Sequence, residues 1–472
     1  MRLNLKDKQV LVLGLGDTGL SALRWLAGQG AVLSVADTRD NAPNIALVQK
    51  ELPQASVHLG PFTAQVLNQA DIIVASPGVA VYGTQAEPQI QAAIRRGIPV
   101  IGDVELFAQY KSPQARVIAI TGANGKSTVT MMIGTMCQAA GLTTVVAGNI
   151  GLPVLEAMTA EAPDIYVLEL SSFQLETTST LQADAATVLN ISEDHMDRYA
   201  SLQDYAAAKA RIFNGTGVQV LNRQDAWSSG MALSGRSVVS FGIDLPPGPD
   251  DFGLLHEQND IWLMQGTSKL IKASEMPVAG LHNACNALAA LALCRALGFE
   301  YAPMLAALRN FKGLPHRVEW VAEIADVAFY DDSKGTNVGA TCAALAGLAS
   351  DNNKVVLIAG GDGKGQDFSP LREAVAQNAR AVVLIGRDAP QISAVLADTG
   401  IPLMQAADMQ QAVQVAAELA QPHDVVLLSP ACASFDMYRN YVHRAEVFVE
   451  AVHALAAASH AGSGASSRMI AQ

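Results

Sequence analysis

Short apolar runs alternate with longer amphipathic stretches along most of the chain, and glycine or polar residues follow each run. In the first hundred residues this pattern predicts strands at Val10–Leu13, Val32–Ala36 and Ile72–Ala75, with a helix at Ser21–Ala27. Strands that are joined through helices pair in parallel, because the chain must cross back over the sheet between them. This part of the chain therefore predicts an α/β unit with a parallel sheet.

The same alternation continues in a middle block. Its expected elements are strands at Val117–Ile120, Ile165–Glu169 and Thr187–Asn190 and helices at Ser201–Phe213 and Asn283–Leu297. The stretch Asp225–Ser274 differs, because it is rich in glycine, aspartate and serine with short alternating runs. We expect an antiparallel excursion or hairpins there.

A third block again alternates strands and helices. Its expected strands are Val327–Asp331, Val355–Ala359, Ala381–Leu384 and Val425–Leu428. Together the blocks predict three α/β domains, at residues 1–110, 111–314 and 315–459. The remaining residues, 460–472, are small and polar, and we expect a disordered tail.

Length and charge narrow the classes of protein. The chain has 472 residues, which suggests two to four domains at roughly 100–200 residues per domain. It has 31 Lys and Arg against 44 Asp and Glu, so its formal net charge is −13. This balance disfavours a nucleic-acid-binding protein, which needs a basic face to neutralise phosphates. An enzyme that binds nucleotides through a few local cations stays compatible with it.

The sequence favours a cytoplasmic protein without a membrane segment. The apolar N-terminal stretch runs directly into a glycine-rich turn and has no cleavage site. Residues 129–155 are uncharged, but glycine and polar residues interrupt them, so a buried helix, turn and strand are favoured over a membrane span. The five cysteines are an odd number without a CxxC pair, which disfavours a disulfide framework or a zinc site.

The first glycine-rich turn is Gly14-Leu15-Gly16-Asp17-Thr18-Gly19, between a predicted strand and a predicted helix. Such a turn presents the helix N-terminal amides to a phosphate. Asp37 ends the next strand, where a carboxylate could bind a ribose hydroxyl, and Arg39 could face a phosphate. The motif alone leaves a dinucleotide, another nucleotide and a purely structural turn open.

The second glycine-rich turn, Thr121 to Thr128, reads TGANGKST and opens a helix after a strand. It departs from the GxxxxGK[ST] pattern, because Ile120 stands where the first glycine is expected. Amides of such a loop cradle phosphates, its lysine reaches the terminal phosphates and its hydroxyls hold magnesium. We expect a phosphate-binding loop formed by Gly122, Asn124, Gly125, Lys126, Ser127 and Thr128, which the family resemblance given below assigns to ATP.

Polar groups follow the next two strands of the middle block. Glu169 ends one strand, where its carboxylate could hold magnesium beside the phosphate loop or cap a helix. His195 lies in a polar run after the following strand, and it could be a metal ligand or a structural histidine. By composition alone, Lys209 is a solvated helix lysine, and Asn283 and Asn286 share a helix face that could serve capping.

Three strand ends of the last block carry Lys334, Thr336, Lys364 and Ser434. In a parallel sheet these ends meet at one edge, where open α/β sheets bind ligands. Two lysines and two hydroxyls suit a small, doubly acidic ligand. The alternative is a set of ordinary turns.

These motifs resemble those of the Mur ligase family, the ATP-dependent amino-acid ligases of peptidoglycan synthesis. The resemblance covers essentially the whole chain up to the tail. It is carried by GLGDTGLS, DTR, ASPGV, TGANGKST, GNIG, LELSSFQLE, NISEDHMDRY, YAAAKARIF, GLHNACNALAA, GLPHRVE, DDSKGTN, GGDGKGQDF and SPACASFDMYRNY. It implies a Rossmann-like N-terminal domain, a central P-loop-type ATP-binding domain with a parallel sheet, and a Rossmann-like C-terminal domain.

Within the family, the D-glutamate-adding members are the most similar. The resemblance therefore implies a monomer that joins D-glutamate to UDP-N-acetylmuramoyl-L-alanine through an acyl phosphate, using ATP and two Mg²⁺ ions. It reassigns the first glycine-rich turn from a redox dinucleotide to the uridine diphosphate end of this substrate. Gly335, Tyr441 and the pair Arg444-Ala445 depart from the family pattern. The changes at Gly335 and Tyr441 concern the fine contacts of the amino-acid pocket and not the reaction.

The resemblance also implies a role for each matching residue. The implied UDP-substrate contacts are Leu15, Asp17, Thr18, Thr38, Arg39, Ser76 and Asn149. The implied ATP contacts outside the phosphate loop are Asn283, Asn286, Arg317 and Asp332. The implied D-glutamate contacts are Lys334, Thr336, Lys364, Ser434, Phe435 and Tyr441. The implied magnesium ligands are Ser127, Glu169, His195 and Lys209, the lysine as a carbamate formed with carbon dioxide. The implied catalytic groups are Lys126, His195 and Lys209.

Three alternatives stay open at this point. Sister ligases add L-alanine, a diamino acid or a dipeptide, although the DNPR motif of the diaminopimelate-adding branch is absent here. A nicotinamide-dependent oxidoreductase would use GLGDTG but leaves GKST and the third domain unexplained. A nucleotide-binding protein without catalysis would show no turnover.

Overall fold

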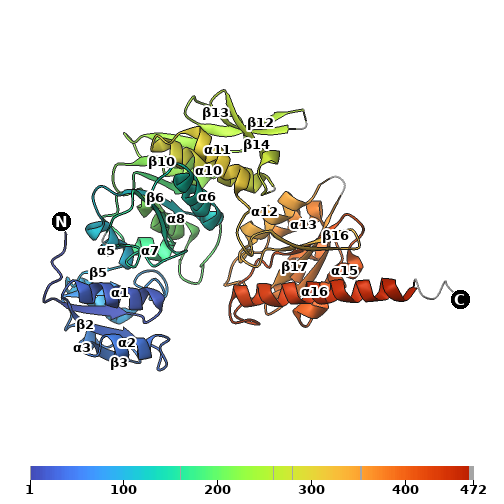
Figure 1. Cartoon of the computed structure of the whole chain (residues 1–472). Helices are drawn as coiled ribbons and strands as arrows, with labels where there is room; N and C mark the ends of the chain where they lie inside the picture. Colours follow the sequence, from blue (N-terminus) through green and yellow to red (C-terminus); the bar gives the residue numbers. More distant parts are fainter. Residues whose placement is uncertain (1, 160, 259, 279, 351–352, 467–472) are drawn as a thin grey trace. The chain divides into compact units, whose positions relative to one another are not determined.

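The computed structural model describes residues 2–159, 161–258, 260–278, 280–350 and 353–466 (Figure 1). The chain forms two compact units. The first comprises Met1–Ile191, Asp197–Met276 and Cys285–Phe311, and the second comprises Ser192–Met196, Pro277–Ala284 and Lys312–Gln472.

A five-stranded sheet forms within the described N-terminal residues, in the order β3-β2-β1-β4-β5. All its strand pairs are parallel. The strands are β1 (Gln9–Leu13), β2 (Val32–Asp37), β3 (Ser56–Leu59), β4 (Ile72–Ala75) and β5 (Val100–Ile101). The helices are α1 (Asp17–Gly28), α2 (Ile45–Glu51), α3 (Ala64–Leu67), α4 (Pro88–Arg95) and α5 (Asp103–Tyr110). The strand order reverses between β1 and β4, which is where such sheets bind ligands.

The central sheet has the order β14-β13-β12-β11-β10-β9-β6-β8-β7 among the described residues. Its strands are β6 (Arg116–Thr121), β7 (Thr144–Gly148), β8 (Ile165–Glu169), β9 (Ala185–Val188), β10 (Val218–Asn222), β11 (Val238–Phe241), β12 (Phe252–Glu257), β13 (Asp260–Gln265) and β14 (Ser268–Lys272). Its helices are α6 (Lys126–Ala139), α7 (Ser172–Glu176), α8 (Leu202–Ala210), α9 (Ala226–Gly230), α10 (Leu281–Ala296) and α11 (Tyr301–Asn310), with short 3₁₀ turns at Arg211–Phe213 and Ala273–Glu275. The strands from β6 to β11 pair in parallel, whereas β12, β13 and β14 form the expected antiparallel excursion.

The third sheet has the order β15-β16-β20-β17-β18-β19 in the described C-terminal part. Its strands are β15 (Glu319–Ile324), β16 (Val327–Asp331), β17 (Val355–Gly360), β18 (Ala379–Ile385), β19 (Leu403–Gln405) and β20 (Val425–Leu428). Its helices are α12 (Val338–Leu348), α13 (Leu371–Asn378), α14 (Ala389–Leu396), α15 (Met409–Leu419) and α16 (Tyr441–Ser466), with a 3₁₀ turn at Ala397–Thr399. Strands β15 and β16 pair antiparallel, and the other strand pairs of this sheet are parallel. Every residue of β17 is buried, because helices cover both faces of the sheet.

The three-domain α/β fold class is confirmed, with differences at particular segments. The uncharged stretch 129–155 contains most of α6, a turn and β7, as expected for a buried globular segment. None of the described helices combines the length and the apolar character that a membrane crossing requires. Strand β9 ends at Val188, two residues before the end that we expected, so Asn190 lies in the loop beyond it.

The C-terminal tail differs from the sequence prediction. Helix α16 continues to Ser466, so residues 460–466 are helical where we expected disorder. The alanine-rich run before residue 460 has a high helix propensity, which favours continuation of the helix. The rest of the expected tail, residues 467–472, lies outside the described part of the chain.

Two short segments of the middle block belong to the second unit. In the first of them, Asp194 accepts a hydrogen bond from the Lys364 ammonium at 3.0 Å, and Glu193 accepts one from the Asp367 amide at 2.9 Å. In the second, His282 lies so close to Gly347 of α12 that a Cβ there would be 2.8 Å from the ring nitrogen Nδ1. These contacts span more than 60 positions in the sequence, so sequence periodicity gives no sign of them.

Candidate active site

The first glycine-rich turn joins β1 to α1 at the point where the strand order reverses. Gly14 has φ +85°, a conformation that favours glycine. A Cβ on Gly19 would lie 1.9 Å from the carbonyl oxygen of Gly14, so the turn closes only with glycine there. Ser76 at the end of β4 donates a hydrogen bond to the same carbonyl oxygen at 3.1 Å. The turn is therefore fixed before any ligand binds.

We expect Gly19→Ala to destabilise the first domain. The added methyl group must displace the Gly14 carbonyl, and overpacking of this kind costs about 1–3 kcal/mol. Gly28→Ala at the end of the same helix is the matched control, because a Cβ there meets nothing within 4 Å. Urea unfolding of both variants checks the prediction, and equal unfolding midpoints would contradict it.

Asp37 is the residue that could bind a ribose hydroxyl in a dinucleotide site, but both its carboxylate oxygens already accept hydrogen bonds from other groups of the protein. Its Oδ2 accepts hydrogen bonds from the Leu15 amide and from Nη2 of Arg39, both at 2.7 Å. Its Oδ1 accepts from the Arg39 amide and from Nε, both at 2.9 Å. The hydrogen bonds from Arg39 lower the pKa of Asp37 to about 2. The carboxylate therefore positions the turn and the Arg39 side chain, which disfavours the redox-dinucleotide interpretation.

A cleft of about 720 Å³ opens beside this turn and reaches the central sheet. Six of the seven residues expected to contact the UDP-substrate line it: Asp17, Thr18, Thr38, Arg39, Ser76 and Asn149. Leu15 does not, because its side chain is fully buried. Gln85, Glu87 and Gln174 also line the cleft, and sequence reasoning missed them. The cleft thus joins residues of the first and central domains within one compact unit.

The phosphate loop lies between β6 and α6, and Asn190 braces it. The Asn190 side chain accepts a hydrogen bond from the Asn124 amide at 2.8 Å and donates one to the Asn124 carbonyl at 3.1 Å. Gly125 has φ +81°, and a Cβ there would lie 2.6 Å from Oδ1 of Asn286. Sequence reasoning placed Asn190 in a polar motif but gave it no role. The loop backbone is therefore fixed by side chains from two other segments.

Lys126 opens α6 and lies over the loop. Its Nζ donates hydrogen bonds to the carbonyl oxygens of Gly122 at 2.9 Å and Ala123 at 2.8 Å. Ser127 and Thr128 follow it in the buried first turn of the helix. The amides at a helix N-terminus attract anions, and the lysine adds a full positive charge beside them. This arrangement suits the phosphates of a nucleotide.

Glu169 lies at the carboxyl end of β8, which pairs in parallel with β6. Its Oε1 accepts a hydrogen bond from Asn149 Nδ2 at 2.6 Å, whereas its buried Oε2 has no hydrogen-bond partner among the described residues. Ser171 caps α7, so helix capping does not explain the glutamate. A buried carboxylate oxygen without a partner is costly unless a cation or a proton satisfies it. Glu169 therefore fits the role of a magnesium ligand beside the phosphate loop.

Lys209 is buried, with 1% of its surface exposed. The prediction of a solvated lysine from composition is wrong, because α8 packs this side chain against the phosphate loop. Its Nζ donates to the Gly122 carbonyl at 2.9 Å and to Oγ1 of Thr121 at 3.3 Å. It also lies 4.5 Å from the ring centroid of Tyr205.

His195 lies in the second unit and has φ +59°. Its Nε2 is 3.5 Å from Oδ2 of Asp194, and its side chain is one-third exposed. The other oxygen of Asp194 accepts a hydrogen bond from Lys364 at 3.0 Å. The structure thus brings an expected metal ligand and an expected D-glutamate contact to the same carboxylate.

The strands β16, β20 and β17 are neighbours in the third sheet, so their carboxyl ends meet as expected. The Lys334 ammonium, after β16, lies 4.0 Å from the ring centroid of Tyr441. Ser434, after β20, is buried, whereas Phe435 is 73% exposed. Thr336 is half-buried beyond β16. The expected D-glutamate contacts therefore surround one sheet edge, although they differ widely in exposure.

Arg444 of α16 holds this edge together, and sequence reasoning gave it no role. It is 1% exposed and donates hydrogen bonds to the carbonyl oxygens of Ser333 at 2.8 Å and Cys432 at 3.1 Å. Burial lowers the pKa of its guanidinium to about 10. The loops after β16 and β20 are thereby tied to the start of α16.

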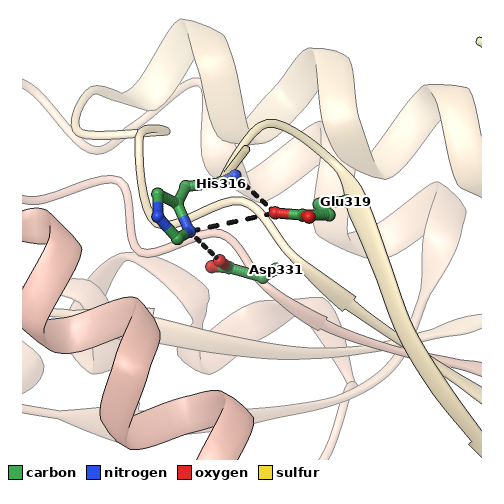
Figure 2. Close-up of side chains that lie close together, drawn as sticks. All are labelled: His316, Glu319 and Asp331. Atoms are coloured by element: carbon green, nitrogen blue, oxygen red, sulfur yellow. Dashed lines mark hydrogen bonds and ion pairs between the residues drawn. The ribbon is translucent and has the colours of Figure 1, made fainter. Parts of the chain in front are cut away.

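His316, Glu319 and Asp331 lie close together where the third sheet begins (Figure 2). The His316 ring nitrogen Nδ1 is 2.7 Å from Oδ2 of Asp331 and 3.9 Å from Oε2 of Glu319. His316 has φ +62°, and Glu319 also accepts its backbone amide at 2.8 Å. The cluster holds the turn that carries Arg317. Burial has the largest effect on the pKa of Asp332 and raises it, whereas the charge of Arg317 lowers it.

Asp332 is a buried carboxyl group, and burial raises its pKa to about 7. Its Oδ2 accepts a hydrogen bond from Ser429 at 2.7 Å. In the unfolded chain an aspartate titrates near about 3.9. Between these two pKa values the folded state binds more protons than the unfolded state, so stability falls as pH rises through this window.

We expect Asp332→Asn to flatten this pH dependence. The amide keeps the shape of the side chain but has no proton to lose, so the variant loses less unfolding free energy than the wild type between about pH 4 and pH 7. Urea unfolding at several pH values measures the difference. Asp398→Asn, at an exposed carboxyl group, is the control. Parallel pH profiles for wild type and Asp332→Asn would refute the prediction.

The sheets, the braced phosphate loop and the buried carboxylate beside it are features of one class of enzyme, and the chain belongs to the Mur ligase family. Residues 8–102 match the MurD-like N-terminal domain of Mur ligases, residues 120–294 the Mur ligase middle domain, and residues 316–432 the Mur ligase glutamate ligase domain.

Curated relatives match almost the whole chain. The UDP-N-acetylmuramoylalanine–D-glutamate ligase of Methylobacillus flagellatus is 64% identical, over 95% of this chain and 98% of the relative. The enzyme of the same name from Thiobacillus denitrificans is 57% identical, over 96% and 98%.

Solved structures share the fold at lower identity. The UDP-N-acetylmuramate-alanine ligase MurC of Thermotoga maritima has a TM-score of 0.59 at 21% identity and covers 95% of this chain and 99% of its own. MurF of Acinetobacter baumannii also has a TM-score of 0.59, at 18% identity, and covers 94% of this chain and 91% of its own. These likenesses concern the fold alone.

Proposed function

We propose that this chain is an ATP-dependent ligase that adds D-glutamate to UDP-N-acetylmuramoyl-L-alanine in peptidoglycan precursor synthesis. The single observation that carries the proposal is identity of 50–64% over nearly full length to eight enzymes of that name. In this proposal residues 1–110 bind the UDP-substrate, 111–314 bind ATP and 315–459 bind the amino acid.

The proposed reaction has two steps. A carboxylate oxygen of the UDP-substrate attacks the γ-phosphorus of ATP, so that an acyl phosphate forms and ADP leaves. The amine of D-glutamate then attacks the acyl carbon, the amide bond forms, and phosphate leaves with the loss of a proton from the amine. In the first step two anions must approach, and the charge of Lys126 with the amides of the phosphate loop lowers this repulsion.

Magnesium ions would add positive charge at the same place when bound. Ser127 and Glu169 are the proposed ligands of one ion, and His195 is a proposed ligand of the second. The unpartnered, buried Oε2 of Glu169 supports this assignment. Lys209, as a carbamate, is the proposed anionic group that helps to hold the metal, and its burial against the phosphate loop supports that role.

The proposed substrate contacts are those that the family resemblance implies, and the lining of the cleft supports those of the UDP-substrate. The cleft beside the first glycine-rich turn is assigned to the UDP-substrate. Asn149, which lines this cleft, directly follows β7 of the central sheet. Asn283, Asn286, Arg317 and Asp332 are assigned to ATP. Lys334, Thr336, Lys364, Ser434, Phe435 and Tyr441 are assigned to D-glutamate, whose two carboxylates suit the two lysines. The five free thiols support a reducing cytoplasm as the location.

Phosphate release tests the reaction and the amino-acid assignment together. The assay contains ATP, magnesium, bicarbonate and UDP-N-acetylmuramoyl-L-alanine, with D-glutamate, L-glutamate, L-lysine or meso-diaminopimelate in separate samples. We expect release with D-glutamate alone. Release with another amino acid would keep the ligase class and overturn the D-glutamate assignment. No release with any of them, from folded protein, would contradict the proposed reaction.

A further inference from the structure

Arg198 is a buried arginine to which the proposed function gives no role. Its exposed fraction is 5%, and it belongs to the polar motif NISEDHMDRY, which also contains His195. Its guanidinium donates hydrogen bonds to the carbonyl oxygens of Pro77 at 3.0 Å and Val79 at 3.3 Å. Both acceptors belong to the loop after β4 of the first domain, whereas Arg198 itself belongs to the central block. The side chain therefore joins two domains within the first unit.

The backbone around Arg198 strengthens the same junction. The Arg198 carbonyl accepts a hydrogen bond from the Thr84 amide at 3.0 Å, and Oγ1 of Thr84 donates to the Asp197 carbonyl at 2.8 Å. A Cβ on Gly83 would lie 2.3 Å from the Arg198 carbonyl oxygen, so these two backbone segments are in close contact. The loop from Pro77 to Thr84 is thus held at both ends by one short segment.

On its other side, Arg198 is anchored to α7. Nη2 forms an ion pair with Oε2 of Glu176 at 2.8 Å, and the other oxygen of Glu176 accepts a hydrogen bond from the Tyr199 hydroxyl at 2.5 Å. The guanidinium lies 4.0 Å from the ring centroid of Phe173. An arginine can make all these contacts at once, because its planar group carries five donors and can stack on an aromatic ring.

Both elements that Arg198 joins line the cleft assigned to the UDP-substrate. Pro77 and Val79 lie on its first-domain wall, and Gln174 of α7 lies on its central-domain wall. A substrate that spans this cleft needs the two walls at a fixed separation, because misplacement of about 1 Å can cost 10²-fold in rate. We propose that Arg198 is a positioning residue that sets the two walls of the cleft for the UDP-substrate. This inference rests on the proposed function.

Arg198→Lys is the central test. Lysine keeps a positive charge beside Glu176, so this buried carboxylate is not left without a cation. The single ammonium of lysine, however, cannot also reach the Pro77 and Val79 carbonyls as the planar guanidinium does. We expect the Kd and the KM for UDP-N-acetylmuramoyl-L-alanine to rise about tenfold, the effect of losing one or two hydrogen bonds. The KM values for ATP and D-glutamate should stay within about twofold, and so should the Kd of free UDP, which needs only the first domain.

Arg236→Lys is the matched control. Arg236 also donates to several backbone carbonyls, those of Phe213 and Gly215 among them, but none of these residues lines the cleft. It should lose stability without a change in any KM. Thr84→Val is the second variant, and it removes one exposed hydrogen bond of the same junction. It should also raise the KM for the UDP-substrate, by a smaller factor than Arg198→Lys does.

The outcomes separate this inference from the proposed function. Unchanged UDP-substrate affinity in both Arg198→Lys and Thr84→Val would overturn the positioning role, and so would an equal loss in Arg236→Lys. Calorimetric binding of UDP and of the full substrate needs no turnover. Wild-type protein that binds the substrate without releasing phosphate would therefore contradict the proposed reaction while the role of Arg198 is still measured.

Discussion

Lys126→Ala is expected to lower D-glutamate-dependent phosphate release by at least about 10²–10³-fold, the usual cost of removing one group that stabilises developing charge. The lysine lies over the phosphate loop, where its Nζ contacts the Gly122 and Ala123 carbonyls. In the proposed reaction, Lys126 is the positively charged side chain of the phosphate loop itself. Binding of the UDP-substrate should persist, because Lys126 does not line the cleft that is proposed for it.

The measurement pairs phosphate release with calorimetric binding of the UDP-substrate to the same protein. Lys111→Ala is the matched control, because Lys111 also donates to two nearby carbonyls, those of Ser112 and Ala115, neither of which belongs to the phosphate loop. It should retain both activities. If folded Lys126→Ala lost substrate binding and turnover to the same degree, the assignment of separate sites would be wrong.

Removal of carbon dioxide is expected to lower activity by at least about tenfold, and added bicarbonate should restore it. The neutral amine of Lys209 would attack carbon dioxide, forming an N–C bond and releasing a proton. The product is an anionic carbamate in place of a cation at a site that is 1% exposed. This charge reversal suits a group that contacts the phosphate loop, because a buried ammonium would repel a metal ion bound there.

Lys209→Arg removes the reactive amine and keeps the charge of the unmodified lysine. We expect this variant to be nearly inactive at every bicarbonate concentration. Carbon-13-labelled bicarbonate should give a carbamate resonance in the wild type that is absent from Lys209→Arg. Burial lowers the pKa of Lys111, which makes this lysine a second candidate for reaction with carbon dioxide, so Lys111→Ala must keep the resonance. Full activity without carbon dioxide would rule out a functional carbamate.

The local parts of the fold followed from the sequence. Strands such as β1, β6 and β17 are apolar runs that end in glycine or polar turns, and both features are visible within about ten residues. The phosphate loop was equally local, because its glycines, lysine and hydroxyls are adjacent in the chain. Parallel topology then followed, since alternating strands and helices leave few other arrangements. The meeting of the β16, β20 and β17 ends at one edge was predicted on this basis.

The roles of single polar side chains were decided by contacts between distant segments. Asp37 looked like a ribose ligand until the structure placed both its oxygens on Leu15 and Arg39. Lys209 looked solvated from composition alone, whereas packing against the phosphate loop buries it. Arg198 carried no sequence signal beyond its motif, because its acceptors at Pro77 and Val79 are about 120 positions away.

The sequence by itself therefore determined the order of strands and helices, the two glycine-rich turns and the family of the protein, because apolar periodicity and motif spacing are properties of neighbouring residues. The tertiary structure alone decided which polar groups are buried, which are already paired and which are left for a ligand. Those properties depend on side chains that come from distant segments of the chain, as Arg198 meets the loop after β4 and Asn190 meets the phosphate loop. Burial and pairing set the free energy of a charge, so the chemistry of the site emerges only when the chain is folded.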